Sequence, residues 1–531
     1  VRARQQYQVE SPHSIIPVLL EARAELQAMP DHPWKQSKDR ELVDLILSCA
    51  GVWAEAYAAD FAIAPGGEIK VTASAINRSP TAIELREVQF VPGPKVEVHH
   101  SLPVNQPQLV EKTFSVPESA ELSNPYWLSQ PPEKGKYPAP DPTLIGLPEQ
   151  PAPIRAEFLF SFGPRTLRIS RPVAYKWTDP VAGERYRPVE ISPPVMINPS
   201  SSVLMFPDRQ ARDLRVLLKA GIADATGVLR SELSGGWTAE PAELPFTLKK
   251  KGEEQELQIR LHPPANGSLS RSDSSISSLR LVAEIQGRKV SKGFRQIEYP
   301  HIPIQTLFPE STVKLVRLDL KKNKSKIAYI AGAGDEVPEA LRQVGYEVTV
   351  LDDATLRTQP LAPFEAIVVG VRAYNVNERM PFYHRKLMKY VSDGGTMVVQ
   401  YNTNNWISRI PVEIGPYPFQ ISRDRVTDED APATFESPHH PLLIRPNKLT
   451  EGDFAGWVQE RGLYFASKWD ERYQTVLSMH DPNEPPKRGG LLAVRYGKGA
   501  FVYTGLAFFR QLPAGVPGAY RLFANLIAYG G

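Results

Sequence analysis

The stretch KIAYIAGAGDEVPEALRQVGYEV, residues 326–348, decides the fold of the last third of the chain. Apolar residues fill 327–330, a glycine-rich turn follows, and a helical pattern runs over 335–345 before a second apolar strand begins. A strand, a helix and a strand in this order are typical of a parallel sheet with helices on both faces. We therefore expect an α/β, Rossmann-like domain over residues 320–531.

The same alternation continues downstream of this stretch. Further strands are predicted at 365–371, 396–402 and 499–509, and helices at 377–395 and 518–529. The expected fold class is accordingly multidomain, with this α/β domain at its C-terminal end.

Upstream, the apolar period changes from helical to alternating. Residues 1–60 are predicted to be a helical connector, whose second helix runs from about residue 37 to 58 and buries Cys49. Short alternating strands with turn signals between them predict two β-sandwich, Ig-like domains, at 61–188 and 189–306. The polar segment 266–278 has the composition of a flexible loop.

The composition and charge of the chain argue against some classes of function. The 531 residues carry a net charge of only +3 and no basic stripe, so a nucleic-acid partner is not expected. No apolar run is long enough to span a bilayer. The chain begins at Val1 rather than at a methionine, so we expect a processed product or a fragment. Its location is left open, a secreted or periplasmic protein being one option.

Ligands of open α/β sheets bind beyond the carboxyl ends of the strands. An activated Cys or Ser would mark nucleophilic catalysis there, but the predicted strand ends offer other polar groups instead. We take these groups as a ligand-binding rim and expect no catalytic residue among them: Asp335, Glu336, Arg372, Asn375 and Asn402. For Asp335 and Glu336, a simple role at the start of a helix is the favoured alternative.

Two other segments carry candidate sites. Asp428 and Asp430 have a spacing similar to a calcium loop but lack its glycine and its final glutamate, so a salt-bridged loop is favoured over an ion site. Tyr126 and Trp127 lie in a proline-rich excursion, where they could stack on sugar rings or, as the favoured alternative, plug a domain interface. Residues 456–473 could cover the α/β strand ends. The ten histidines show no zinc-ligand spacing, so no metal is expected in this chain.

Several motifs are specific enough to indicate a family. The C-terminal motifs are residues 326–348, 366–378, 394–406, 416–432, 453–465 and 502–526, and the upstream ones are INRS (76–79), NPYWL (124–128), 174–194 and EYPHIPIQ (298–305). Together they closely resemble the C-terminal and middle regions of large bacterial PIG-L/LmbE-type deacetylases. The last domain resembles the class I glutamine amidotransferase-like fold, also seen in ThuA-like proteins.

The resemblance implies zinc-dependent deacetylation of N-acetylglucosamine-type glycans, catalysed by an N-terminal domain with a His-Pro-Asp-Asp-Glu motif. That motif is absent from this sequence, so the resemblance transfers no catalytic residue and no zinc ligand to it. The leading hypothesis is an accessory, substrate-positioning portion that pairs with such a deacetylase domain and contacts a glycan. The alternatives are a stand-alone carbohydrate-binding protein and, least favoured, a hydrolase built on Asp335, Glu336 and Arg372.

Overall fold

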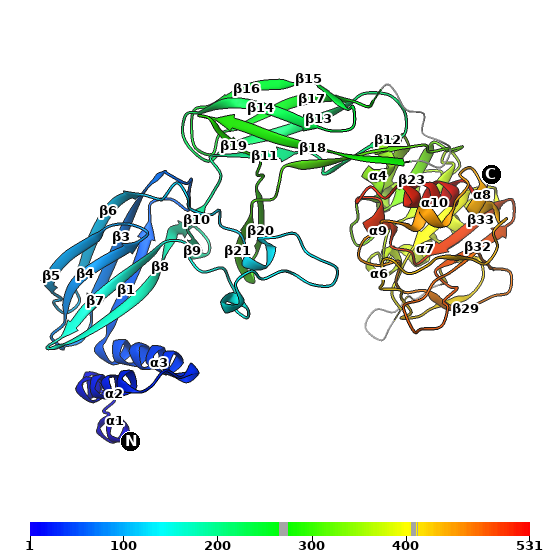
Figure 1. Cartoon of the computed structure of the whole chain (residues 1–531). Helices are drawn as coiled ribbons and strands as arrows, with labels where there is room; N and C mark the ends of the chain where they lie inside the picture. Colours follow the sequence, from blue (N-terminus) through cyan, green and yellow to red (C-terminus); the bar gives the residue numbers. More distant parts are fainter. Residues whose placement is uncertain (265–273, 405–409, 411–412, 531) are drawn as a thin grey trace.

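The computed structural model describes residues 1–264, 274–404, 410 and 413–530. Figure 1 shows three bodies in chain order: a β-rich body carrying the N-terminal helices, a second β-rich body, and a rounder body of mixed helices and strands. The prediction of a multidomain chain rich in β-sandwich-like structure is confirmed. In the part of the chain that the structure describes, we find no helix with the length and apolarity needed to cross a membrane.

The N-terminal helices are shorter than the sequence pattern predicts. They are α1 (Arg2–Gln6), the short 3-10 helix η1 (Pro12–Ile15), α2 (Ile16–Ala28) and α3 (Pro33–Ala50). Gly51 ends α3 in the left-handed conformation, at φ 63°, and its N–H bonds to the carbonyls of the last turn. The predicted helix up to Ala58 is therefore wrong at its end: Val52–Ala58 forms strand β1, which alternates between buried and less buried residues.

These helices pack on the first sandwich. Ile16 and Leu19 of α2, with Ile46 and Leu47 of α3, are buried in the same apolar cluster as the strands. The surface that covers the connector helices is thus supplied by this chain.

The first sandwich is an eight-stranded sheet in the order β5-β4-β7-β8-β1-β3-β6, with β9 paired to β8. The first half of β8 pairs antiparallel with β7, and its second half pairs with β1 and β9, so this long strand joins two layers around one core. The strands are β1, β3 (Glu68–Asn77), β4 (Glu84–Val91), β5 (Lys95–Ser101), β6 (Pro107–Ser115), β7 (Arg155–Phe162), β8 (Arg165–Asp179) and β9 (Gly183–Pro188).

The second sandwich has two sheets, in the orders β11-β13-β17-β15 and β12-β22-β18-β14-β16, with β19 paired to β18. Its strands are β11 (Val195–Pro199), β12 (Val203–Phe206), β13 (Arg212–Ala220), β14 (Ala225–Leu233), β15 (Thr238–Glu240), β16 (Glu243–Leu248), β17 (Glu254–His262), β18 (Ser274–Ile285), β19 (Arg288–Val290) and β22 (Thr312–Leu318).

Two details of the second sandwich differ from the sequence predictions. Strand β22 pairs with β12 and β18, so the sheet continues past the predicted end at residue 306. Residues 274–278 belong to β18 and are not a loop, because the strand pairs with β22 from its first residue. The rest of the predicted loop, 266–273, lies outside the described residues.

Two small two-stranded sheets accompany the sandwiches. Strands β2 (Ala62–Ile63) and β10 (Glu190–Ile191) pair in parallel, and β20 (Arg295–Tyr299) and β21 (Ile302–Leu307) form an antiparallel hairpin. The long segment 116–154, drawn in cyan, leaves the first sandwich and runs toward the α/β body (Figure 1).

The last body contains a seven-stranded sheet in the order β24-β23-β25-β26-β33-β32-β30. The five strands from β24 to β33 are parallel. Strand β32 runs antiparallel to β33, and β30 runs antiparallel to β32. The strands are β23 (Lys326–Ile330), β24 (Glu347–Leu351), β25 (Ala366–Val369), β26 (Thr396–Gln400), β30 (Gln474–Thr475), β32 (Leu491–Tyr496) and β33 (Gly499–Thr504). Two short sheets, β27 (Phe419–Ile421) with β29 (Ala466–Trp469) and β28 (Thr434–Phe435) with β31 (Leu477–Ser478), complete it.

Helices cover both faces of this sheet. Apolar residues of α4 (Val337–Gln343) and α10 (Pro517–Ala528) are buried in one cluster, and those of α5 (Asp353–Thr358) and α7 (Met380–Ser392) in another. The short helices α6 (Ala373–Val376), α8 (Pro441–Ile444), η4 (Glu451–Phe454) and α9 (Phe508–Gln511) lie in the connections.

The second sandwich and the α/β body share a core. Val203, Met205, Val316 and Leu318, from β12 and β22, belong to the same buried cluster as α4 and α10. The backbone N–H of Met205 donates to the side-chain oxygen of Gln343 at 3.0 Å. The edge of the second sandwich therefore serves as one wall of the α/β body.

Candidate functional site

A buried polar network begins at the carboxyl end of β23. The hydroxyl of Tyr329 lies 2.5 and 2.6 Å from the two carboxylate oxygens of Asp335, to which it donates. Gln400, at the end of β26, donates its amide to the same hydroxyl at 3.2 Å. Burial, followed by the charge of Asp335, raises the pKa of Tyr329, so the phenol stays protonated as a donor.

Asp335 also holds two backbone segments together. Its carboxylate accepts from the N–H of Val337, at the start of α4, at 3.1 Å and from the N–H of Val371 at 3.2 Å. The structural role at the helix start that the sequence favoured is thus present for Asp335. Glu336 is exposed and makes no side-chain capping bond to this helix.

The turn from β25 to α6 places Arg372 in an unusual conformation. Its backbone has φ 57° and ψ 21°, in the left-handed region that non-glycine residues seldom adopt. The N–H of Arg372 donates to the carbonyl of Tyr401 at 2.8 Å, which fixes the turn against the end of β26. In the described part of the chain, the buried side-chain Nε of Arg372 has no hydrogen-bond partner.

The two predicted asparagines stabilise the same turn. The side-chain oxygen of Asn402 accepts from the N–H of Tyr374 at 3.0 Å, and its amide donates to the carbonyl of Gln400 at 3.0 Å. Asn375 exchanges two hydrogen bonds with the backbone of Thr403, at 2.6 and 2.9 Å. These contacts bring Asn375 and Asn402 to the same edge as Asp335 and Arg372, but as supports of the backbone.

Aromatic rings from three segments meet beside this turn. The ring of Tyr401 stacks on Tyr464, with centroids 5.8 Å apart and planes 9° apart, and lies 5.2 Å from the ring of Phe509. The guanidinium of Arg510 is 4.8 Å from the Phe509 ring centroid and donates to Glu460 at 2.9 Å. We call Arg372, Tyr401, Tyr464, Phe509 and Arg510 the aromatic edge.

The charges of the aromatic edge act on Tyr401. Burial raises the pKa of its hydroxyl, and the nearby Arg372 and Arg510 partly oppose that rise. Tyr401, Tyr464, Phe509 and both arginines are only partly buried. The edge therefore presents aromatic faces and two cations at the carboxyl ends of parallel strands.

Of the aromatic edge, the sequence analysis named Arg372 and placed Tyr401, Tyr464 and Phe509 only within predicted segments, and it did not predict that they meet. Tyr464 comes from the 456–473 segment that we expected to cover the strand ends, and it does stack on Tyr401. Trp457 of the same segment is buried, as the cover interpretation predicted. Asn405 and Trp406, which follow the same strand, lie outside the described residues.

Tyr126 and Trp127 form a separate pair in the 116–154 segment. Their rings pack edge to face, with centroids 4.9 Å apart, and the Tyr126 hydroxyl donates to the carbonyl of Leu147 at 3.2 Å. Both residues are half-buried. The pair thus stabilises the fold of its own loop.

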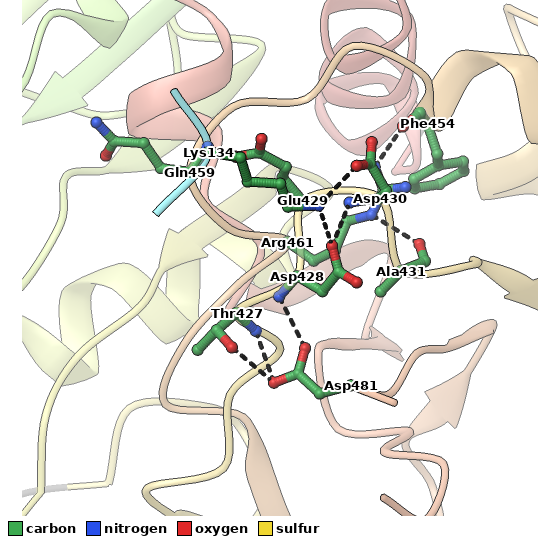
Figure 2. Close-up of polar contacts among 10 residues, drawn as sticks. All are labelled: Lys134, Thr427, Asp428, Glu429, Asp430, Ala431, Phe454, Gln459, Arg461 and Asp481. Carbon is green, nitrogen blue, oxygen red and sulfur yellow. Dashed lines mark hydrogen bonds and ion pairs between the residues drawn. The ribbon is translucent and has the colours of Figure 1, made fainter. Parts of the chain in front are cut away.

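The acidic loop at residues 427–430 is tied to the first sandwich by a lysine (Figure 2). Lys134, from the 116–154 segment, places its ammonium 2.7 Å from a carboxylate oxygen of Asp428 and 2.7 Å from one of Asp430. Asp481 accepts from the backbone N–H groups of Thr427 and Asp428, which orders the loop from the other side. The favoured interpretation of a salt-bridged loop is confirmed.

A buried arginine lies under the acidic loop. Arg461 donates to the carbonyl of Ala431 at 2.9 Å and to that of Phe454 (Figure 2). Its guanidinium lies 5.5 Å from the Trp457 ring centroid. Burial lowers the pKa of Arg461 to about 10, although the neighbouring carboxylates act in the opposite direction. Across the described ranges, no three His, Cys, Asp or Glu side chains group in a way that could hold a metal ion.

No family model and no curated protein matches the chain. The matching solved structures include the periplasmic chaperone SfaE, at 11% identity and a TM-score of 0.15 over 23% of this chain and 56% of the chaperone. They also include native Escherichia coli alpha-2-macroglobulin, at 7% identity and a TM-score of 0.17 over 50% of this chain and 17% of that protein.

A protein of unknown function from Porphyromonas gingivalis W83 matches at 13% identity, with a TM-score of 0.13, over 50% of this chain and 98% of that one. The chain thus spans about half of the chaperone and under a fifth of the macroglobulin. At these TM-scores the likenesses carry no argument about the fold or the function.

Proposed function

We propose that the chain is the accessory, glycan-positioning portion of a PIG-L/LmbE-type deacetylase and that its aromatic edge holds a glycan without transforming it. The observation that carries the proposal is the meeting of Tyr401, Tyr464 and Phe509 between two arginines at the carboxyl ends of parallel strands. Ligands of open α/β sheets bind at this edge. The sequence motifs that resemble the deacetylase family support the choice of glycan.

The proposal includes a Rossmann-like, class I glutamine amidotransferase-like fold for the last body. The parallel strands β24 to β33 with helices on both faces support it. In hydrolases of α/β type, a sharp strand-to-helix turn presents the nucleophile. Arg372 occupies the left-handed turn between β25 and α6, and a guanidinium is a hydrogen-bond donor that cannot act as a nucleophile. The turn is therefore suited to holding a ligand.

The chemistry of the edge fits a glycan of N-acetylglucosamine type. The apolar face of a sugar ring packs on aromatic faces such as that of Tyr401. The guanidinium groups of Arg372 and Arg510 can donate to ring hydroxyls and to an acetamide oxygen. The zinc of the deacetylation belongs, in this proposal, to a partner domain, because the described residues here include no group that fits it.

Binding of chitotetraose tests the proposal. We expect Tyr401→Ala to weaken binding in calorimetric titration about tenfold, because one stacking face is lost. Tyr7→Ala serves as a matched control, because this tyrosine is exposed near the N-terminus, far in sequence from the aromatic edge. This substitution should leave the affinity unchanged. Equal affinities for the wild-type chain and Tyr401→Ala would reject the aromatic edge as the site.

The accessory role has its own test. We expect that adding the chain to a separately produced PIG-L-type deacetylase domain raises its rate on chitotetraose and that the two co-purify. Unchanged rates together with separate elution would contradict an accessory role.

A stand-alone carbohydrate-binding protein is the second candidate, with the Tyr126–Trp127 pair as its site. Trp127 is only partly buried, and its ring meets that of Tyr126 edge to face. Loss of chitotetraose binding in Trp127→Ala, with Tyr401→Ala unaffected, would favour this candidate.

A further inference from the structure

We propose that the junction between the two sandwiches contains a second binding site, which takes one uncharged sugar unit. A cavity of about 330 Å³ lies there, lined by residues of both sandwiches and of the segments that flank the β20–β21 hairpin. This volume falls at the low end of the range, about 300–1,000 Å³, of small-molecule sites in proteins. We call it the junction cavity.

Aromatic and apolar side chains form much of its wall. Phe294 and Phe308, whose ring centroids are 6.2 Å apart, line it together with Phe61 and Met196. Phe308 and Met196 are buried, whereas Phe61 and Phe294 are half-buried. Such rings offer packing surface for the C–H face of a sugar.

Two buried polar residues line the same space. Glu190 and Ser192 line the cavity and are 6% and 3% exposed. The hydroxyl of Ser192 has no hydrogen-bond partner within the described residues, which is costly for a buried polar group. A ligand with hydroxyl groups would satisfy it, and a purely apolar ligand would not.

The charges around the cavity are already neutralised. Glu190 accepts from Arg187 at 2.9 Å, and both side chains are buried. At the rim, Lys251 pairs with Asp60 at 2.7 Å and Lys219 with Glu254 at 2.9 Å. A charged ligand would find no uncompensated partner among these pairs, so an uncharged, hydroxyl-rich ring fits best.

The wall is fixed before any ligand binds. The N–H of Phe294 donates to the side chain of Asn198 at 2.7 Å, and the N–H of Phe308 donates to that of Asn124 at 2.9 Å. The parallel pairing of β10 with β2 positions Glu190, and the N–H of Ser192 donates to the carbonyl of Ile63 at 2.8 Å. Preorganised groups reduce the entropy that binding costs.

Saturation-transfer NMR on the full chain tests the inference with glucose, N-acetylglucosamine and methyl mannoside as neutral probes. Glucosamine and glucuronate serve as cationic and anionic probes. We expect saturable binding of a neutral sugar in the millimolar range. Ser192→Ala should weaken it about two- to tenfold, because one hydrogen bond is lost, and Phe294→Ala by a similar factor.

Ser192→Ala is expected to keep the melting temperature of the wild type or raise it, because the hydroxyl that it removes lacks a partner. Thr81→Val is the matched control, since Thr81 also has a buried hydroxyl without a partner but does not line the cavity. Binding of the neutral sugar should be unchanged in this control.

The inference is independent of the aromatic edge, so Tyr401→Ala should leave the junction signal intact. It is overturned if no neutral probe binds, if Ser192→Ala and Phe294→Ala both bind as the wild type does, or if a charged probe binds more tightly than every neutral one. Sugar binding that is lost only in Tyr401→Ala would overturn the junction site while supporting the proposed function.

Discussion

Arg372 stores backbone strain at the edge where a ligand is expected. A left-handed conformation costs a residue with a side chain about 1–2 kcal/mol, and strain of this kind clusters at functional sites. The surrounding contacts maintain it through the bonds of Tyr401, Asn402 and Asn375 to the turn. A substitution at Arg372 can therefore raise the stability of the fold while it weakens ligand binding.

We predict that Arg372→Gly stabilises the fold by about 1 kcal/mol and weakens glycan binding at the aromatic edge. Glycine adopts φ 57° without strain, but it removes the guanidinium donor. Denaturant unfolding measures the first effect and calorimetric titration of chitotetraose the second. Asp224→Gly, at φ 51° in the second sandwich, should stabilise similarly and leave binding unchanged. A destabilised Arg372→Gly would contradict the assignment of strain.

Lys324 is a residue whose burial makes the stability of the fold depend on pH. Burial lowers the pKa of this lysine from 10.5 to about 8, and its ammonium donates to the Thr396 hydroxyl at 2.6 Å. Between these two pH values the unfolded chain binds more protons than the folded one, so stability rises with pH across that window. Below pH 8 both states are protonated, and the full cost of burying the charge remains.

We predict that Lys324→Met is about 2 kcal/mol more stable than the wild type at pH 7. The advantage should shrink as the pH rises from about 8 to 10.5, because the buried lysine then loses its charge. Urea unfolding at several pH values measures it. Lys326→Met, at an exposed position two residues away, should show a small difference without this pH trend. An advantage for Lys324→Met that grew over the same interval would refute the assigned burial cost.

At the scale of elements, local patterns predicted the regular parts well. The strands β23, β25, β26 and β33 and the helices α7 and α10 lie where apolar periodicity placed them, because their period and their glycine stops are local signals. β1 was misjudged, since WAEAYA is rich in alanine and follows a true helix directly. The left-handed Gly51 was the signal that a helix had ended.

Contacts between distant segments could not be predicted in this way. Tyr401, Tyr464 and Phe509 belong to three segments that the sequence analysis treated separately, and nothing in their sequence neighbourhoods indicates that their rings meet. The same holds for Lys134 with Asp428 and for the residues of the junction cavity. Such pairings depend on how whole sheets are placed, which a single sequence does not encode locally.

The 116–154 segment gives a prediction at this scale. Hydrogen bonds to Asp428 and Asp430 raise the pKa of Lys134, so this contact is charged at all physiological pH values. We predict that Lys134→Ala makes the segment more sensitive to limited proteolysis, because it loses its attachment to the α/β body (Figure 2). High salt should have the same effect on the wild type.

Lys136→Ala is the matched control for that experiment. Lys136 is two residues away and pairs with Glu133 inside the segment, so its loss should leave proteolysis nearly unchanged. Equal cleavage rates for the two variants would show that the contact of Lys134 does not anchor the segment.

At the scale of the whole molecule, the second sandwich and the α/β body should unfold together, because they share a core. Met205 is fully buried among residues of both bodies, whereas Val88 is buried in the separate core of the first sandwich. We predict that Met205→Ala costs about 2–5 kcal/mol and lowers the stability of both later bodies together. Hydrogen exchange in denaturant, followed by mass spectrometry, measures the protection of backbone amides separately for peptides from each body.

Val88→Ala is the corresponding control, and it should weaken protection only in the first sandwich. If Met205→Ala left the protection of α10 at its wild-type level, the two later bodies would have to unfold independently.

The common core also has a consequence for how such a chain could be assembled by gene shuffling. A recombination break near residue 320 would leave Val203, Met205 and Val316 without their covering helices and would open one side of α4 and α10. A gene segment that encodes a folded last body would therefore have to begin before β11. It would then include the second sandwich, whose strands complete the core of the last body.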